Sequence, residues 1–361
     1  MKRTVIILLS ITSVVLSSCK FEEPDLFDDS AANRLLKAQA EYTKILCSAP
    51  NGWVMDYFPN VDSEYASTYP NVDMSGRTLL VKFQDGAATL ASKHNLTGNR
   101  FMRDTCAFAV ITDNGPVLSF NTYGENGLLH FFADPGPYPT SDELGVGYYG
   151  DYEFMVLNAT AEVVKLKGKK HGTYIDLRRL PDSQDWESYF QMLADKENNL
   201  LDTRVTLVLR RDDEVIYTLS EGYSHTFNAL PPGGDPISQT TRTPFMITDY
   251  GLLLAKNFET DSLKTNVRTF RLNAEGTKLI ADENSEYSIT PPSLDMFLQQ
   301  STSVFLATKE NITGMDALFD QISAEFVSAF NSTRALNSIG FGKRNDKPAM
   351  VLYLQNGTYA Y

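Results

Sequence analysis

Short apolar segments separated by tight turns recur along the chain, and this pattern constrains the fold more than any other feature. Thr78–Phe83 and Ala87–Ser92 flank the turn Asp85-Gly86, and Cys106–Thr112 and Val117–Phe120 flank Asp113–Pro116. Runs of this length joined by such turns are typical of β-hairpins. Because parallel neighbours need long crossover connections, successive hairpins predict an antiparallel meander.

Seven further segments read as strands, and three others have apolar residues at helical spacing. The strands are Trp53–Phe58, Tyr152–Leu157, Glu162–Lys167, Thr173–Arg179, Val205–Arg210, Val215–Ser220 and Ser224–Ala229. The first helix is Ala31–Leu46, the second follows Asp182–Gln184, and the third runs from Met315 to Phe330. We therefore predict an α+β fold, mainly antiparallel β, made of two halves that each consist of a helix and a β-meander.

The two halves share a short sequence. Ile111–Gly115 and Ile247–Gly251 match at four of five positions, at an offset of 136 residues. This indicates an internal pseudo-repeat, although unrelated hairpin turns also converge on such residues, and both explanations stand. We place one half at residues 28–181 and the second at residues 182–361, which ends in a helix and a hairpin.

The first residues form a targeting segment. Lys2 and Arg3 precede the uncharged run Thr4–Leu16, which is too short to span a bilayer. The sequence Leu16-Ser17-Ser18-Cys19 resembles the bacterial lipobox, in which the cysteine is acylated. We expect residues 1–18 to be a signal peptide, Cys19 to be the site of lipid attachment, and residues 19–27 to be a tether.

The residues after Cys19 indicate where the anchored protein lies. Lys20-Phe21-Glu22-Glu23 is similar to the signal that sends Bacteroidota lipoproteins to the outer face of the outer membrane. We expect an outer-membrane lipoprotein exposed at the cell surface, with the periplasmic face as the alternative. Cys47 and Cys106 would then lie in an oxidising compartment, as two free thiols or as a disulfide.

Composition argues against several classes of partner. With 32 Lys+Arg and 45 Asp+Glu the formal charge is −13, which repels nucleic acid. Only four histidines and three cysteines are available as metal ligands. Gly145–Gly150 fits G-x-G-x-x-G, but a strand rather than a helix follows it. We expect no metal and no cofactor.

Tyrosines near or within loops are the candidate ligand-binding residues. They are Tyr123, Tyr138, Tyr148 and Tyr149. Sugar rings stack on exposed aromatic faces, although aromatic residues that complete a β core would give the same pattern. The loop acids Asp142-Glu143 and Asp212–Glu214 are the candidates for a cleft hydrolase, which needs two carboxylates across a cleft.

Four motifs carry a resemblance to a known family. Phe27–Ala32, Asn51–Tyr57, Gly150–Phe154 and Lys167–Gly172 resemble the Bacteroidota lipoproteins of domain-of-unknown-function family 4302, over essentially the whole mature chain. The family brings no activity or site residue with it. Such lipoproteins are commonly encoded beside starch-utilisation-type outer-membrane transporters, so the resemblance implies a role in nutrient capture.

We therefore expect a binding protein for a glycan or a peptide, working with an outer-membrane transporter complex. The alternatives are a cleft hydrolase that uses loop carboxylates and a structural or assembly partner of the transporter. An enzyme is the less favoured class, because no catalytic motif is present in the sequence.

Overall fold

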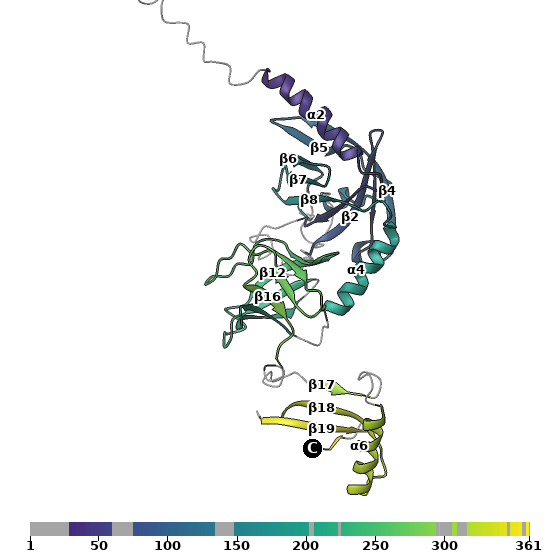
Figure 1. Cartoon of the computed structure of the whole chain (residues 1–361), viewed down its shortest axis with the longest axis vertical. Helices are drawn as coiled ribbons and strands as arrows, with labels where there is room; N and C mark the ends of the chain where they lie inside the picture. The colour runs from purple at the N-terminus through teal and green to yellow at the C-terminus, as the bar shows by residue number, and fades with distance from the viewer. Residues whose placement is uncertain are drawn as a thin grey trace, which may run out of the picture.

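The computed structural model describes residues 29–59, 75–133, 148–201, 206–222, 225–293, 296, 305–308, 316–344, 347–355 and 359–360. Their strands form two closed antiparallel barrels and a four-stranded sheet (Figure 1). Within this part of the chain, helix α2 precedes the first barrel in the sequence, helix α4 precedes the second, and helix α6 lies between the first two strands of the sheet. The predicted α+β fold, mainly antiparallel, is confirmed.

Barrel 1 is an eight-stranded meander in which each strand pairs with the next and β1 also pairs with β8. Its strands are β1 Trp53–Tyr57, β2 Arg77–Gln84, β3 Ala87–Ser92, β4 Met102–Thr112, β5 Pro116–Phe120, β6 Glu153–Ala159, β7 Val163–Gly168 and β8 Tyr174–Arg179. Alternate residues point inward, as Asp104, Cys106, Phe108 and Val110 of β4 do. Large aromatic residues, including Trp53 and Phe154, fill the interior.

Helix α2, Ala31–Cys47, covers the end of barrel 1 that is remote from barrel 2 (Figure 1). The Ser30 hydroxyl accepts a hydrogen bond from the Asn33 amide and begins the helix as its N-cap. At the other end, Leu46 is fully buried in the barrel core, and its carbonyl accepts a hydrogen bond from Trp53 Nε1 at 2.8 Å. The helix therefore acts as a lid on the barrel interior.

Barrel 2 repeats this architecture. Its strands are β9 Leu207–Arg211, β10 Glu214–Glu221, β11 Thr226–Leu230, β12 Thr241–Thr248, β13 Gly251–Leu254, β14 Thr269–Leu272, β15 Leu279–Ala281 and β16 Tyr287–Thr290. β16 pairs with β9 and closes the barrel. Phe227 and Phe245 stack in its core with ring centroids 4.0 Å apart.

The shared pentapeptide occupies the same position in both barrels. Ile111–Gly115 leads from the fourth strand, β4, to the fifth, β5, and Ile247–Gly251 leads from β12 to β13. Equal strand number, equal strand order and this turn at an equivalent position all support a pseudo-repeat.

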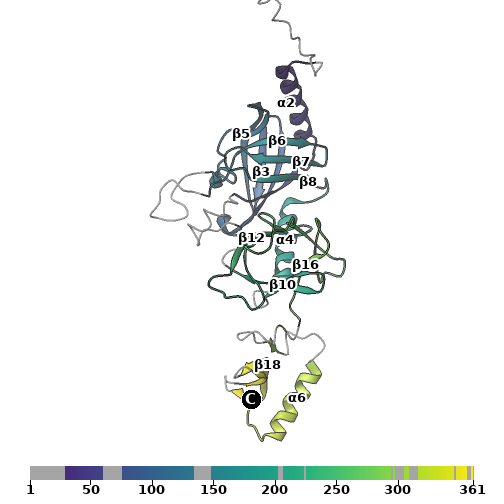
Figure 2. The same cartoon turned by 90° about the vertical axis from the view of Figure 1, so that its left-hand side faces the viewer.

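Helix α4, Trp186–Leu200, precedes barrel 2 in the sequence but packs on the outer wall of barrel 1. Trp186, Tyr189, Phe190 and Leu193 form an apolar cluster with Val54, Leu80, Ala91 and Leu180. The Asp185 carboxylate caps the helix by accepting a hydrogen bond from the Ser188 amide at 2.8 Å. Figure 2 shows α4 at the junction of the two barrels.

The last unit is a small sheet with one helix. It consists of β17 Phe305–Ala307, α6 Asp316–Ala329, β18 Leu336–Arg344, β19 Lys347–Leu354 and β20 Tyr359–Ala360. Phe319 of α6 packs with Leu336 and Ile339 of β18. Residues 182–361 therefore contain a complete barrel and, after it, a separate sheet.

The targeting segment and the cysteines remain to be placed. The signal peptide, Cys19 and the tether fall within residues 1–28, outside the described residues. Cys47, exposed at the end of α2, and Cys106, buried in β4, are both free thiols, so the disulfide alternative is wrong. No helix in the described ranges is long and apolar enough to cross a bilayer.

Candidate functional site

The two barrels meet through an apolar contact beside a charged one. Phe58, which follows β1, is fully buried against Met246, Leu253 and Ala255 of barrel 2. The Gly76 amide donates a hydrogen bond to the Phe245 carbonyl at 3.4 Å, which joins the backbones of the two units.

The charged contact centres on Arg178 of β8. Its guanidinium donates to Asp56 Oδ2 at 2.8 Å and to both Asp249 oxygens at 2.8 and 3.1 Å. Burial alone would lower the pKa of Arg178, but the carboxylates of Asp56 and Asp249 raise it above its usual value. The arginine therefore stays charged and links an acid of its own barrel to an acid of the other.

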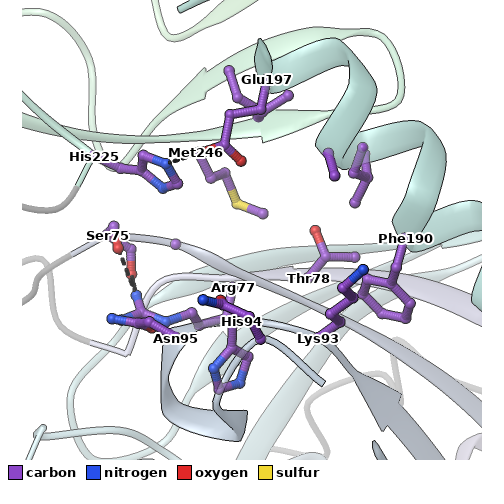
Figure 3. A pocket seen from close by; sticks show the side chains of 15 residues that line it. Ser75, Arg77, Thr78, Lys93, His94, Asn95, Phe190, Glu197, His225 and Met246 are labelled. Carbon is purple, nitrogen blue, oxygen red and sulfur yellow. Dashed lines mark hydrogen bonds and ion pairs between the residues drawn. The ribbon is translucent and has the colours of Figure 1, made fainter. Parts of the chain in front are cut away.

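A cavity of about 400 Å³ opens between the barrels (Figure 3). Its volume lies within the roughly 300–1,000 Å³ of typical small-molecule sites. Barrel 1 contributes Ser75, Gly76, Arg77, Thr78, Lys93, His94, Asn95 and Asn99, helix α4 contributes Phe190, Leu193, Ala194 and Glu197, and barrel 2 contributes His225, Met246 and Ile247.

Arg77 organises the barrel 1 wall of this cavity. It begins β2 and is only 3% exposed. Its guanidinium donates to Ser75 Oγ at 2.7 Å, to the Ser75 carbonyl and to Asn95 Oδ1 at 3.4 Å. Figure 3 shows these three residues along one wall. A buried guanidinium with several N–H groups fixes the surrounding loops and directs polar atoms toward the cavity.

Glu197 and His225 form the opposite wall, where the imidazole Nε2 lies 2.8 Å from Glu197 Oε1 (Figure 3). The hydrogen bond to His225 is the main reason why the pKa of Glu197 lies below its ordinary value. The pair connects α4, which packs on barrel 1, to the residue before β11. It therefore joins the same two units as Arg178 does.

Tyr123 lies on an exposed aromatic stack on the β5–β6 connection. The Tyr123 side chain is 62% exposed, and its ring centroid is 4.3 Å from that of His130, which in turn lies 5.3 Å from Tyr152. His130 is buried, and its Nε2 is 2.9 Å from the Phe120 carbonyl oxygen. Burial lowers the pKa of His130, so the stack has a neutral centre.

Tyr148 and Tyr149 differ in exposure. Tyr149 is 39% exposed and lies beside His171, with ring centroids 5.1 Å apart, whereas Tyr148 is 1% exposed and packs on Phe132. The Tyr148 ring thus belongs to the core of barrel 1. Tyr138 lies outside the described residues.

None of the three described tyrosines lines the inter-barrel cavity. A recess of about 70 Å³ beside Phe131 and Phe132 shares one lining residue, His94, with the cavity. The cavity residues themselves escaped the sequence analysis. Arg77 gave the only usable signal, a charged residue immediately before an apolar strand.

Of the candidate loop acids, those that the structure describes do not line this cavity. Asp212–Glu214 forms the exposed β9–β10 turn, and Asp142-Glu143 lies outside the described residues. Among the described side chains, no group of three or more His, Cys, Asp or Glu is placed to hold a metal ion.

Comparison with known families adds one result. The sequence matches a family model described as a domain of unknown function, DUF4302, over residues 23–274, which is more than half of the chain. The chain belongs to the DUF4302 family. The match covers barrel 1 and ends after β14 of barrel 2, so it is shorter than the almost complete coverage that we expected. No curated protein matches this DUF4302 chain.

The motifs that carried the resemblance hold barrel 1 together. Asn51 Nδ2 donates to the carbonyls of Pro181 and Gln184, at 2.8 and 2.6 Å, and so ties β1 to the start of α4. The Tyr57 hydroxyl accepts a hydrogen bond from the Asp151 amide at 2.7 Å. The Asp151 carboxylate accepts from backbone amides of the β7–β8 turn. In this DUF4302 chain these motifs are therefore structural.

Proposed function

We propose that this DUF4302 protein is a lipid-anchored binding protein that captures a nutrient, a glycan or a peptide, for an outer-membrane uptake system of the starch-utilisation type. The inter-barrel cavity is its ligand site. One observation carries the proposal: the cavity is lined by polar side chains from both barrels and is large enough for a small ligand.

The chemistry of the lining suits a sugar. Lys93, Asn95 and Asn99 offer hydrogen-bond donors, and Glu197 offers an acceptor, for hydroxyl groups. Phe190, Leu193 and Met246 offer apolar surface to the C–H groups of a sugar ring. Exposed Tyr123 and Tyr149, on loops of barrel 1, lie outside the cavity and offer separate aromatic surface to a ligand.

The lining favours binding over cleavage. Glycoside hydrolysis normally uses two carboxylic acids that face each other across the substrate. Among the described residues that line the cavity, Glu197 is the one carboxylate, and it is hydrogen-bonded to His225. A binding role needs no second acid, so it fits this lining better than hydrolysis does.

The anchor is tested separately from the ligand. Cells that express the chain are fed an alkyne fatty acid, and we expect the protein to become labelled and to be accessible to protease on intact cells. Cys19→Ala should abolish the label because it removes the acylated thiol. An unlabelled wild-type chain would contradict the anchor, and labelled but protease-protected protein would place it on the periplasmic face.

The ligand is tested with the soluble form that lacks Cys19, by glycan array and by pull-down from digested polysaccharide and peptide mixtures. We expect a retained glycan, and at least tenfold weaker retention in the Asn95→Ala and Glu197→Gln variants. Glu214→Gln, at an exposed turn, is the matched control. If no glycan or peptide were retained, or if retention were unaffected by both cavity variants, the proposed site would be wrong.

A further inference from the structure

A second, smaller cavity lies between the barrels at the Arg178 contact. Its volume is about 230 Å³. From barrel 1 it is lined by Asp56, Tyr174, Asp176 and Arg178, and from barrel 2 by Tyr250, Leu253, Arg268, Thr269, Arg271 and Asp282. This volume is below the range of roughly 300–1,000 Å³ for drug-sized ligands, which limits any occupant to a small molecule.

Most charged groups around this cavity already have partners. Arg178 binds Asp56 and Asp249, as described above. Arg271 Nε donates to both oxygens of Asp282, at 2.8 and 2.7 Å. The guanidinium groups of Arg178 and Arg271 both lie over the Tyr250 ring. Their Cζ atoms are 4.9 and 4.8 Å from the ring centroid. These contacts fix the walls of the cavity.

Arg268 and Asp176 are the exceptions. The half-buried Arg268 donates from Nε to the Leu254 carbonyl at 2.9 Å, and within the described chain its two terminal nitrogens have no acceptor. Asp176, an exposed residue of β8 that lines the same cavity, has no hydrogen bond or ion pair to its carboxylate among the described residues. Both groups line one cavity from opposite barrels, yet they are not in contact.

The electrostatics agree with this geometry. Burial lowers the pKa of Arg268, while the carboxylate of Asp176, among other acids, opposes that change through space. The two charges are therefore close enough to interact but too far apart to form an ion pair. Because Arg268 lines the cavity, a ligand carboxylate placed there gains charge-assisted hydrogen bonds to its guanidinium.

We propose that this cavity binds a small zwitterion of the α-amino acid class. The ligand carboxylate accepts two hydrogen bonds from the terminal nitrogens of Arg268, whose planar fork matches a carboxylate. The ligand ammonium donates to Asp176. A simple anion would meet the uncompensated charge of Asp176, and a simple cation would leave Arg268 without an acceptor.

This site is separate from the larger cavity, so it stands or falls independently of the proposed function. The test is isothermal titration of the full-length purified chain with L-alanine, L-glutamine and L-tyrosine. We expect saturable binding of at least one of them. Propionate and ethylamine, which each keep one charged group of alanine, should bind at least tenfold more weakly than the best amino acid.

Variants assign the two contacts. Arg268→Gln and Asp176→Asn should each weaken amino-acid binding at least tenfold, and Arg268→Lys should weaken it less than Arg268→Gln because it keeps the charge. Lys165→Gln, directly across the strand pair from Asp176, is the matched control and should bind as the wild type does. Circular dichroism establishes that each variant folds.

Three outcomes would overturn the proposal. They are no saturable binding of any of the three amino acids, propionate binding as tightly as the amino acids, and unchanged binding in the Arg268→Gln variant. Protection of the wild-type chain against thermal unfolding by the same amino acid provides an independent readout, since a ligand that binds only the folded state raises the midpoint.

Discussion

The same turn has different surroundings in the two barrels. In barrel 1, Asp113 pairs with Lys169 at 2.7 Å, and these side chains are 43% and 36% exposed. In barrel 2, the equivalent Asp249 pairs with Arg178 of barrel 1, whose other partner, Asp56, is 5% exposed. One turn thus faces solvent and the other joins the barrels, so the same local structure serves different roles in the two units.

The elements that pack over these two turns differ as well. In barrel 1, α2 lies over the strand that leads into the turn, and Gln39 Nε2 donates to the Val110 carbonyl at 2.6 Å. In barrel 2, the residues at this turn contact barrel 1 itself, through Asp249 and through Tyr250 beneath Arg178. Docking of one barrel on the other therefore takes the place of a helical lid.

The largest expected effect comes from breaking the inter-barrel ion pairs. Arg178→Ala leaves Asp56 buried without its cation, so we expect the free energy of unfolding to fall by about 4 kcal/mol. Urea denaturation at neutral pH measures this change. Arg179→Ala removes the adjacent arginine, which pairs at 3.4 Å with the exposed Asp182, and should change little. Equal losses in both variants would contradict a specific role for Arg178.

A pair of glycine substitutions tests the turn itself. Gly115 and Gly251 have φ of +139° and +150°, so alanine is strained at both. A Cβ at Gly251 would lie 2.3 Å from the Phe270 carbonyl oxygen, whereas nothing lies within 4 Å of one at Gly115. We expect losses of about 3 kcal/mol for Gly251→Ala and about 1 kcal/mol for Gly115→Ala, measured by thermal unfolding. Similar losses in the two variants would mean that the backbone near Gly251 and Phe270 shifts to accommodate the added Cβ.

Local structure was largely predictable because local sequence determines it. Short apolar runs and turns such as Asp85-Gly86 located β1–β11, and Asp182–Gln184 located the start of α4 within a few residues, whereas β12–β16 were not predicted as strands. Barrel closure was not predicted, because β1 pairs with β8 through residues more than 100 positions apart. Likewise, nothing near α4 in the sequence indicates that it packs on barrel 1.

The candidate site was likewise predictable where it depends on local sequence and not where it depends on long-range packing. Exposure of Tyr123 follows from its loop position, but the same reasoning does not distinguish exposed Tyr149 from buried Tyr148. The inter-barrel cavity could not be foreseen, because its walls combine residues from Ser75 to Ile247. The hydrogen bond between Glu197 and His225 depends on how barrel 2 docks, which no local pattern records.

The Glu197–His225 pair gives a smaller, pH-dependent effect on the same junction. The pKa of Glu197 in the folded state lies below its ordinary value of 4.5, so its contribution to stability is present above that pH and is lost as pH falls through the folded value. Because Glu197 is 43% exposed, we expect a contribution below about 1 kcal/mol. Glu197→Gln should be less stable than the wild type at neutral pH, and urea midpoints should converge in acid. A difference between the two midpoints that grows as pH falls would contradict the expected stabilisation by ionised Glu197.

Breaking the equivalent ion pair in barrel 1 should have the smallest effect. Lys169 lies between Asp113 and Glu153, at 2.7 and 3.0 Å, and these carboxylates raise its pKa. Solvent screens all three groups, so Lys169→Ala should leave the urea midpoint within experimental scatter. Any residual difference should vanish in added salt, which screens exposed charges more than buried ones. A loss as large as that of Arg178→Ala would show that position at the inter-barrel junction is not what makes Arg178 important.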